Sequence, residues 1–298
     1  MNILVIGGAG FLGSHLVERL IAEDHAVDVV DDLSTGSLAN LADARSSGGS
    51  LKIHTLDVLA AEFAALTAMR SPDVVYHLAW MPPGRVDAAA AGRAVQSVLS
   101  VLEAVRPQGA KVVTALPAAA LYGDVPLRDL PIKEGHAWNP VGLGGIIAKA
   151  VVDLLNLYRA DHTVEFTALA MSNVYGSRQR ADGGVVGSFA HALRSGTSPQ
   201  IHGDGRQTRD FLYVDDAVDA LVRAGGRGGG LVVNIGTGVS TSIRDLWNMM
   251  AGPSAAAPVN APRRTNDIAR FALSPTRARI HLAWAPWTDL GVGLRSLA

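Results

Sequence analysis

Short apolar runs alternate with longer helix-like stretches along the first half of the chain. Each run is long enough for one buried strand, and the stretches between runs have the length and residue types of helices. Strands that alternate with helices predict a parallel sheet covered by helices on both faces. We expect strands at Asn2–Ile6, Ala26–Val30, Leu51–Thr55, Asp73–His77, Lys111–Ala115 and Glu165–Ala170, and helices at Ser14–Ala22, Ala61–Met69, Ala88–Val105 and Leu143–Arg159.

The second half of the chain is less regular. Glycines interrupt it at Gly183–Gly184 and Gly225–Gly230, and Pro, Ala and Ser crowd Pro253–Pro262. We therefore place a domain boundary near Met171. Residues 1–170 are expected to form a doubly wound α/β domain. Residues 171–298 are expected to form mainly a smaller lobe, with segments that return to the first domain.

Composition and charge argue against several classes of protein. The 298 residues carry 26 Lys and Arg against 27 Asp and Glu, a net charge of −1, which disfavours a nucleic-acid or membrane-surface partner. The lack of cysteine removes cysteine nucleophiles, disulfides and thiolate metal sites. No metal site is expected, because the histidines show no ligand spacing. No apolar run is long enough for a membrane span and no signal-peptide pattern opens the chain, so we expect a cytoplasmic protein.

A glycine-rich turn follows the first predicted strand and opens the first predicted helix. Gly7, Gly10 and Gly13 allow a tight turn, a close approach to a pyrophosphate and close packing of the helix on the sheet. Asp31 ends the second strand 31 − 13 = 18 residues later, close to the spacing of the acid that binds an adenine ribose. The pattern predicts that the first domain binds a dinucleotide.

The acidic pair at the end of the second strand bears on the cofactor. Asp31 and Asp32 favour NAD(H) over NADP(H), because a carboxylate repels a 2′-phosphate. Ser34 and Thr35 could hydrogen-bond such a phosphate, so NADP(H) stays open. Asp57, after the third strand, is either an adenine contact or a solvated turn residue.

Six blocks of sequence resemble the extended short-chain dehydrogenase/reductases, in their nucleotide-sugar epimerase and dehydratase branch. The resemblance covers nearly the whole chain and implies a Rossmann-type fold and an NAD(P)-dependent oxidoreductase. It also implies that the second lobe, mainly residues 171–298, binds a small-molecule substrate. The blocks are Ile6–Leu16, Asp31–Gly36, His77–Ala79, Asn173–Gly176, Gly203–Asp216 and Asn234–Gly238.

The resemblance also implies roles for single residues. Asn173, Arg209 and Arg264 occupy positions where the family holds a nucleotide diphosphate, a task that suits arginine. Alternatively, the block Arg209–Asp216 joins the two lobes. The family often dimerises, so a homo-oligomer is possible. The residues implied in cofactor binding are Gly7, Gly10, Phe11, Leu12, Gly13, Asp31, Asp32, Ser34, Asp57, Val58, Leu78, Ala79 and Lys149.

The catalytic pattern of the family is broken. Its members use a Ser or Thr, a Tyr, and a Lys four residues after the Tyr, and the Tyr acts as general acid or base. Here the hydroxyl position falls at Ala118. Aligning Lys149 with the family lysine puts Gly145 at the Tyr position, and a rival register puts Val141 there and loses the lysine. No Tyr occurs from Gly123 to Leu157, so the acid is missing in either register.

Three interpretations of this gap remain open. The chain could be a ketoreductase whose aromatic polyketide substrate carries its own phenolic acid. These losses resemble those of an atypical ketoreductase of the family that reduces an angucyclinone in antibiotic biosynthesis. Alternatively, Tyr122, His77, Tyr175 or Ser172 serves as a substitute acid in a nucleotide-sugar reaction, or the chain binds a dinucleotide without catalysis.

The stretch Trp80–Gly84 bears on this choice. It follows the fourth strand, at the edge of the sheet where ligands bind. Trp80 and Met81 would suit a flat apolar substrate, although they could equally be core residues. Ala118 and Gly145 would leave room for such a substrate. We therefore expect NAD(P)H-dependent reduction of an aromatic polyketide ketone, with Lys149 orienting the cofactor.

Overall fold

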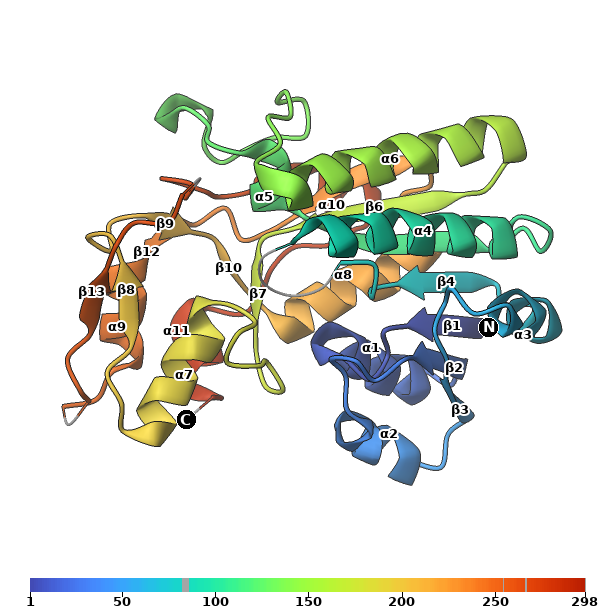
Figure 1. Ribbon diagram of the computed structural model, residues 1–298, viewed down its shortest axis with the longest axis horizontal. Coiled ribbons are helices and arrows are strands. Elements are labelled where there is room, and N and C mark those ends of the chain that lie inside the picture. The colour runs from blue at the N-terminus through green and yellow to red at the C-terminus, as the bar shows by residue number, and fades with distance from the viewer. Residues whose placement is uncertain (82–85, 254, 266, 298) are drawn as a thin grey trace.

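A seven-stranded parallel sheet forms the centre of the molecule (Figure 1). The computed structural model describes residues 1–81, 86–253, 255–265 and 267–297. The strand order is β11-β6-β5-β4-β1-β2-β3, so the chain starts near the middle and winds outward in both directions. The strands are β1 (Asn2–Ile6), β2 (Ala26–Asp31), β3 (Leu51–Thr55), β4 (Val74–His77), β5 (Lys111–Pro117), β6 (Phe166–Met171) and β11 (Leu231–Ile235).

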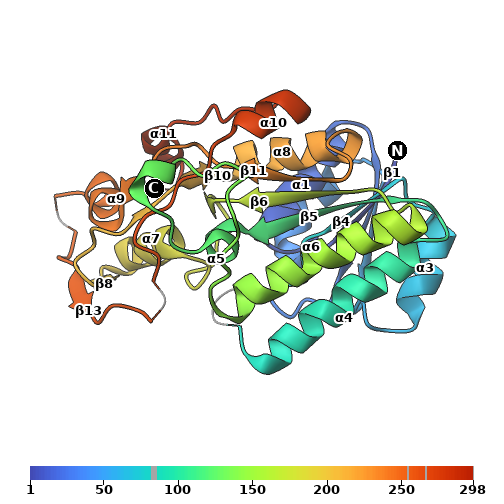
Figure 2. The ribbon, with the colours of Figure 1, turned by 90° about the horizontal axis from the view of Figure 1, so that it is seen from above.

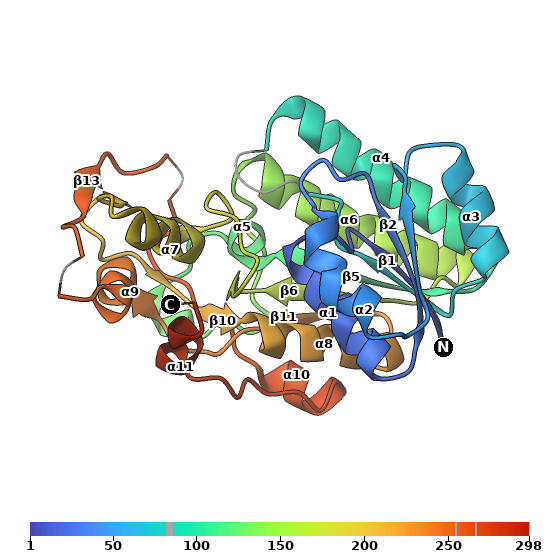
Figure 3. The ribbon, with the colours of Figure 1, turned by 90° about the horizontal axis from the view of Figure 1, so that it is seen from below.

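Helices cover both faces of this sheet (Figures 2 and 3). On one face lie α3 (Glu62–Arg70), α4 (Ala88–Val105) and α6 (Gly142–His162), and on the other lie α1 (Phe11–Ala22) and α8 (Val214–Gly226). Each face buries its own apolar core, as the hydrophobic effect requires of a sheet that is apolar on both sides. The predicted doubly wound α/β fold is confirmed.

The six predicted strands are also confirmed, with ends that shift by at most two residues. The seventh, β11, was not predicted, because the glycine-rich segment Gly225–Gly230 before it indicated irregular structure. β11 pairs in parallel with β6, with Leu231 opposite Thr167. Residues beyond Met171 therefore complete the central sheet, while the domain boundary itself remains a prediction.

The remaining elements are short. Three two-stranded pairs, β7 with β10, β8 with β13, and β9 with β12, lie beyond the carboxyl edge of the main sheet together with α7, α9 and α11 (Figure 1). Their bounds are β7 (Asn173–Tyr175), β8 (Gln200–His202), β9 (Thr208–Arg209), β10 (Phe211–Tyr213), β12 (Thr241–Ser242), β13 (Val259–Ala261), α7 (Val185–Ser195), α9 (Ile243–Met250) and α11 (Leu290–Arg295). The others are η1 (Leu38–Leu41), α2 (Ala42–Ser46), α5 (Ala118–Tyr122), η2 (Leu127–Asp129) and α10 (Thr276–His281).

One helix of the described residues, α4, is long and apolar enough to cross a membrane by length and composition alone. In the structure its apolar side packs into the core against the sheet and α6, with Val98, Val101, Leu102 and Val105 buried. A core helix of a globular protein has the same composition, so this feature does not indicate a membrane span.

Candidate functional site

The glycine-rich turn between β1 and α1 adopts the geometry that its sequence predicts. Gly7 has φ +82°, in the left-handed region that favours glycine. Its N–H donates to Val30 O at 2.8 Å, and Gly10 N–H donates to Gly7 O at 3.1 Å. A Cβ at Gly13 would lie 2.1 Å from Gly7 O, so α1 approaches the turn as closely as glycine allows. The free N–H groups at the start of α1 therefore face the space where a pyrophosphate would lie.

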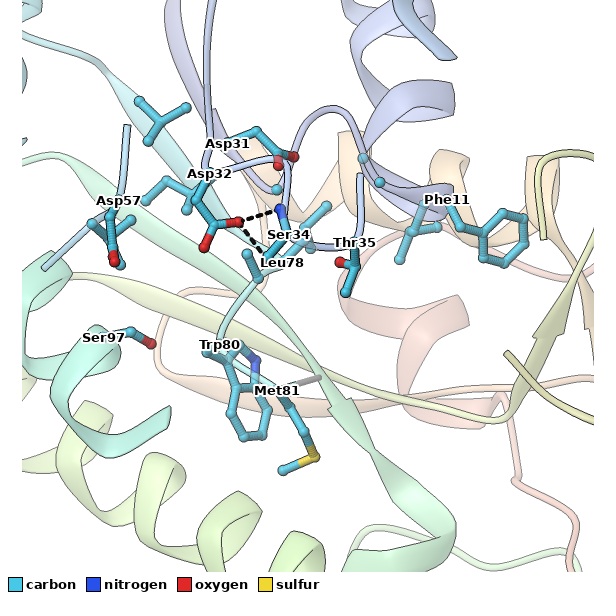
Figure 4. Close-up of a pocket in the computed structure, with 18 of the residues that line it drawn as sticks. Phe11, Asp31, Asp32, Ser34, Thr35, Asp57, Leu78, Trp80, Met81 and Ser97 are labelled. Atoms are coloured by element: carbon cyan, nitrogen blue, oxygen red, sulfur yellow. Dashed lines mark hydrogen bonds between the residues drawn. The ribbon is translucent and has the colours of Figure 1, made fainter. Parts of the chain in front are cut away.

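A cavity of about 580 Å³ opens at this turn, at the carboxyl ends of β1, β2 and β4 (Figure 4). All the residues implied in cofactor binding line it except Lys149. Trp80, Met81 and Thr35 line it too, as do several residues that sequence reasoning did not single out: Leu56, Arg93, Ser97, Gln179 and Arg180. The last two come from the loop after β7, so no local sequence pattern could have pointed to them.

Asp31 is held at the floor of this cavity by two backbone donors. Its carboxylate accepts the N–H groups of Ala9 and Leu33, each at 2.9 Å, and the side chain is buried. Burial raises the pKa of Asp31, while these two hydrogen bonds act in the opposite direction. The donors fix the carboxylate beside the turn, where its remaining lone pairs could accept ribose hydroxyls.

The cavity thus fits a dinucleotide along its length. The turn and the start of α1 would hold the pyrophosphate, Asp31 the adenine ribose, and the apolar side chains of Val58 and Leu78 the adenine. The roles of the single residues remain predictions, because the argument rests on the shape and polarity of the cavity.

The expected catalytic positions lie in α5 and α6. None of these positions carries a hydroxyl group. Ala118 is fully buried at the start of α5. Val141 N–H donates to Ala120 O at 2.8 Å, which joins the start of α6 to α5. A Cβ at Gly145 would lie 2.2 Å from the same carbonyl oxygen. Gly145 therefore marks a close helix contact, and the structure corrects the expectation that it leaves room for a substrate.

Lys149 is the clearest correction to the sequence-based site. Its ammonium donates to Asp153 Oδ2 at 2.7 Å, one turn further along α6, and its side chain is 48% exposed. It lies on the solvent face of α6 and does not line the cavity. The position that faces α5 is Gly145, four residues after Val141. This geometry favours the register in which Val141 occupies the tyrosine position and the lysine is lost.

Replacing Lys149 with alanine should therefore change cofactor affinity by less than about twofold, because an exposed i,i+4 ion pair contributes only a few tenths of a kcal/mol. The dissociation constant for NADH, measured by fluorescence titration, checks this. Asp153→Ala is the matched control and should behave alike. A selective loss of affinity of tenfold or more in Lys149→Ala alone would restore the predicted role.

The two tyrosines proposed as substitute acids form hydrogen bonds outside the cavity. None of the five tyrosines, all in described parts of the chain, lines the cavity. The hydroxyl of Tyr122 donates to Asn234 Oδ1 at 2.9 Å, and burial raises the pKa of Tyr122 to about 12. The hydroxyl of Tyr175 donates to Leu290 O at 3.3 Å. The other three are Tyr76, Tyr158 and Tyr213.

The two other residues proposed as substitute acids, His77 and Ser172, are also not placed in the cavity. His77 is buried at the end of β4, with Nε2 3.2 Å from Ser97 Oγ, and burial lowers the pKa of His77 to about 3. The imidazole is therefore neutral at physiological pH and holds no acidic proton to give. Ser172 is buried, and its hydroxyl finds no partner among the described residues. Neither His77 nor Ser172 lines the cavity.

Trp80 lies mainly in the core, whereas Met81 is less buried, and both border the cavity. The Trp80 indole is buried, and its Nε1–H donates to Ala115 O at 3.1 Å, so only part of the ring borders the cavity. Met81 is less buried and lies near Gly144, at the start of α6. The remainder of the predicted stretch, residues 82–84, lies outside the described residues.

The residues expected to hold a nucleotide diphosphate do not line the cavity. Arg209 donates to the carbonyl oxygens of Thr208 and Ile268 and, at 2.6 Å, to Asp267 Oδ1. Asn173 is part of β7 and pairs with Phe211 of β10. This geometry fits the alternative in which the segment around Arg209 joins the two lobes.

Comparisons with known proteins find a family model and relatives that match most of this chain. The family model described as "NAD dependent epimerase/dehydratase family" matches residues 3–236. A UDP-glucose 4-epimerase of Mycolicibacterium smegmatis is 40% identical over 99% of this chain and 96% of its own length.

Solved structures agree with this match. The UDP-glucose 4-epimerase of Thermotoga maritima, solved with UDP-glucose, superposes with a TM-score of 0.93 at 32% identity, covering 100% of this chain and 97% of that one. The Thermus thermophilus enzyme, solved with NAD, gives 0.88 at 28% identity, covering 100% and 97%. The fold, the dinucleotide cavity and these matches together show that the chain belongs to the NAD-dependent epimerase/dehydratase family.

Proposed function

We propose that this protein is an NAD(P)H-dependent ketoreductase whose substrate, an angucyclinone-type aromatic ketone beside a phenol, supplies the acid that the chain lacks. The observation that carries the proposal is the absence of a tyrosine from the described lining of the cavity, together with Ala118 at the hydroxyl position. A general acid contributes about 10²–10⁴ in rate, so an enzyme without one needs another source of the proton.

The chemistry divides between substrate, cofactor and chain. NADH or NADPH, when bound, supplies the hydride that adds to the ketone carbon. The phenol beside the ketone polarises the carbonyl through an internal hydrogen bond and gives its proton to the oxygen that becomes the alcohol. Water then returns a proton to the phenolate. The chain holds ketone and cofactor in attack geometry, an effect worth several kcal/mol.

The apolar wall at Trp80 and Met81 supports a flat substrate. Both side chains border the cavity on the side away from the acidic pair Asp31–Asp32, as Figure 4 shows. Thioether and indole groups bind an aromatic ring more favourably than a hydroxyl-rich sugar. The comparisons reach only the family and do not extend to this substrate.

A second candidate is a nucleotide-sugar epimerase or dehydratase, favoured by the 40% identity to a UDP-glucose 4-epimerase. That chemistry must take a proton from a sugar hydroxyl and return it in each cycle. The described lining of the cavity offers the hydroxyls of Ser34, Thr35 and Ser97 for this step, and those of Ser34 and Ser97 are bonded to Asp32 Oδ1 and Ala94 O. Neither is therefore placed as a free acid.

Two substrate panels separate the candidates. One holds ortho-hydroxyaryl ketones with their ortho-methoxy analogues, and the other holds UDP- and dTDP-sugars. We expect oxidation of NADH or NADPH at 340 nm only with the hydroxyaryl ketones, and a rate at least about 10²-fold lower for the methoxy analogues, which have no proton to give. Conversion of the sugars alone, detected by product analysis because epimerisation consumes no net NADH, would overturn the proposal. Cofactor binding without turnover of either panel would identify a binding protein.

A further inference from the structure

The adenosine end of the cavity is lined by three carboxylates, one of them buried and two partly exposed. Asp31 is buried and accepts two backbone N–H groups. Asp32 and Asp57 are 36% and 35% exposed and line the cavity. NADPH differs from NADH by a 2′-phosphate, a group with roughly two negative charges. Without compensation, these carboxylates would repel it and restrict the site to NADH.

Arg93 supplies that compensation from another element. It projects from α4 across the cavity, with Nη2 2.5 Å from Asp57 Oδ2 and 3.5 Å from Asp32 Oδ2. Burial alone would raise the pKa of Asp57. The hydrogen bond from Arg93, the backbone N–H of Leu59 and the charge of Arg93 together outweigh burial, so the pKa of Asp57 lies below its ordinary value. The Arg93 side chain is half exposed, so its guanidinium can exchange one anionic partner for another.

Two hydroxyl donors line the cavity together with Arg93, and one of them, Ser34, contacts the same carboxylate, Asp32. Ser34 donates to Asp32 Oδ1 through its N–H at 2.9 Å and its hydroxyl at 2.6 Å, and Thr35 lines the same part of the cavity (Figure 4). A guanidinium and two hydroxyls in one cavity are a suitable set of donors for a phosphate monoester.

A second arginine that lines the cavity, Arg180, forms an ion pair with Asp182. Arg180 donates to both carboxylate oxygens of Asp182 at 2.9 Å, and more weakly to Thr35 O at 3.4 Å. Its charge is matched by that of Asp182. Arg93, in contrast, lies between Asp32 and Asp57, the two partly exposed carboxylates at this end of the cavity.

We infer that Arg93 is the specificity-determining residue that allows this cavity to take NADPH as well as NADH. It neutralises Asp32 and Asp57 and offers its guanidinium to the 2′-phosphate, with Ser34 and Thr35 as further donors. Without Arg93, the two carboxylates remain unbalanced and the phosphate is repelled. The inference concerns cofactor binding alone, so it stands or falls independently of the substrate proposed above.

Cofactor titrations without any ketone test this inference. Dissociation constants for NADPH and NADH are measured for the unaltered protein, Arg93→Ala, Arg93→Lys and the matched control Arg180→Ala. We expect Arg93→Ala to weaken NADPH binding at least about tenfold, because it removes a charge-assisted hydrogen bond, while NADH binding changes less than about threefold. Arg93→Lys should recover part of the loss, since it keeps the charge. Retained NADH binding shows that each variant is folded.

A complementary variant tests the repulsion itself. Asp32→Asn removes one carboxylate and should strengthen NADPH binding several-fold, with a smaller effect on NADH. Raising the salt concentration should weaken NADPH binding more than NADH binding. The inference is overturned if Arg93→Ala weakens both cofactors equally, if it leaves NADPH binding unchanged, or if the selective loss appears in Arg180→Ala instead.

Discussion

Replacing Gly13 with alanine is expected to abolish measurable dinucleotide binding and to lower the free energy of unfolding by about 3 kcal/mol or more. The added Cβ would lie 2.1 Å from Gly7 O, 2.8 Å from Gly7 C and 2.9 Å from Gly8 Cα. All three are backbone atoms, so no side-chain rotation relieves the overlap. Either α1 moves away from β1 or the turn opens, and both changes displace the N–H groups that would bind the pyrophosphate. Urea denaturation and NADH titration measure the two effects.

Gly92→Ala is the matched control for this substitution. Gly92 lies within α4, and a Cβ there would meet no atom within 4 Å. Alanine is a better helix former than glycine, so this variant should be unchanged or more stable by about 0.5–1 kcal/mol. If Gly13→Ala instead kept its stability and bound NADH within about tenfold of the unaltered protein, the close approach of α1 to the turn would not be what shapes the site.

The cofactor end of the site could be predicted from the sequence because its signals are local. Gly7, Gly10, Gly13 and Asp31 lie within a single strand–helix–strand unit, and their spacing follows from the geometry of that unit. All four residues line the same cavity in the structure. Arg93 was missed for the opposite reason. It reaches Asp57 from a helix 36 residues further along the chain, since 93 − 57 = 36, and no periodicity links the two positions.

The reaction end shows where residue counting fails. The sequence allowed two registers for α6, which differ by one helical turn. The choice depends on which side of α6 packs on α5, and that is decided by the close contact between Gly145 and Ala120 O, a tertiary contact. The same contact argues against installing a tyrosine at Gly145 as a test of catalysis, because the variant would not keep α6 in place. Val141 is the position that this register identifies.

The comparisons and the site chemistry therefore address different questions. Similarity to UDP-glucose 4-epimerases extends over the whole chain and, with the family match, establishes the fold and the family. Reaction chemistry depends on a few side chains, and a shared fold does not determine it. Here Ala118 stands at the position where the resemblance implies a hydroxyl residue. Val141 stands at the tyrosine position in the register that the contact between α5 and α6 favours, and Gly145 stands there in the other register.

The largest stability effect outside the turn is expected at Asp210, between β9 and β10. Its carboxylate is fully buried and accepts N–H groups from Thr237, Gly238 and Leu273 at 3.0–3.1 Å, and the Thr237 hydroxyl at 2.7 Å. These donors come from the loop after β11 and from the segment before α10, so one side chain joins three parts of the chain. Asp210→Ala leaves several buried donors without a partner, each costing about 1–3 kcal/mol.

We therefore expect Asp210→Ala to lower the free energy of unfolding by about 3–5 kcal/mol in urea denaturation. Asp210→Asn, which keeps the shape and one acceptor oxygen, should lie between that variant and the unaltered protein. Asp215→Ala is the matched control, because Asp215 is exposed in the first turn of α8 and should contribute less than about 1 kcal/mol. A loss below about 1 kcal/mol for Asp210→Ala would contradict the interpretation that this segment joins the lobes, and would return Arg209 beside it to the role of a substrate ligand.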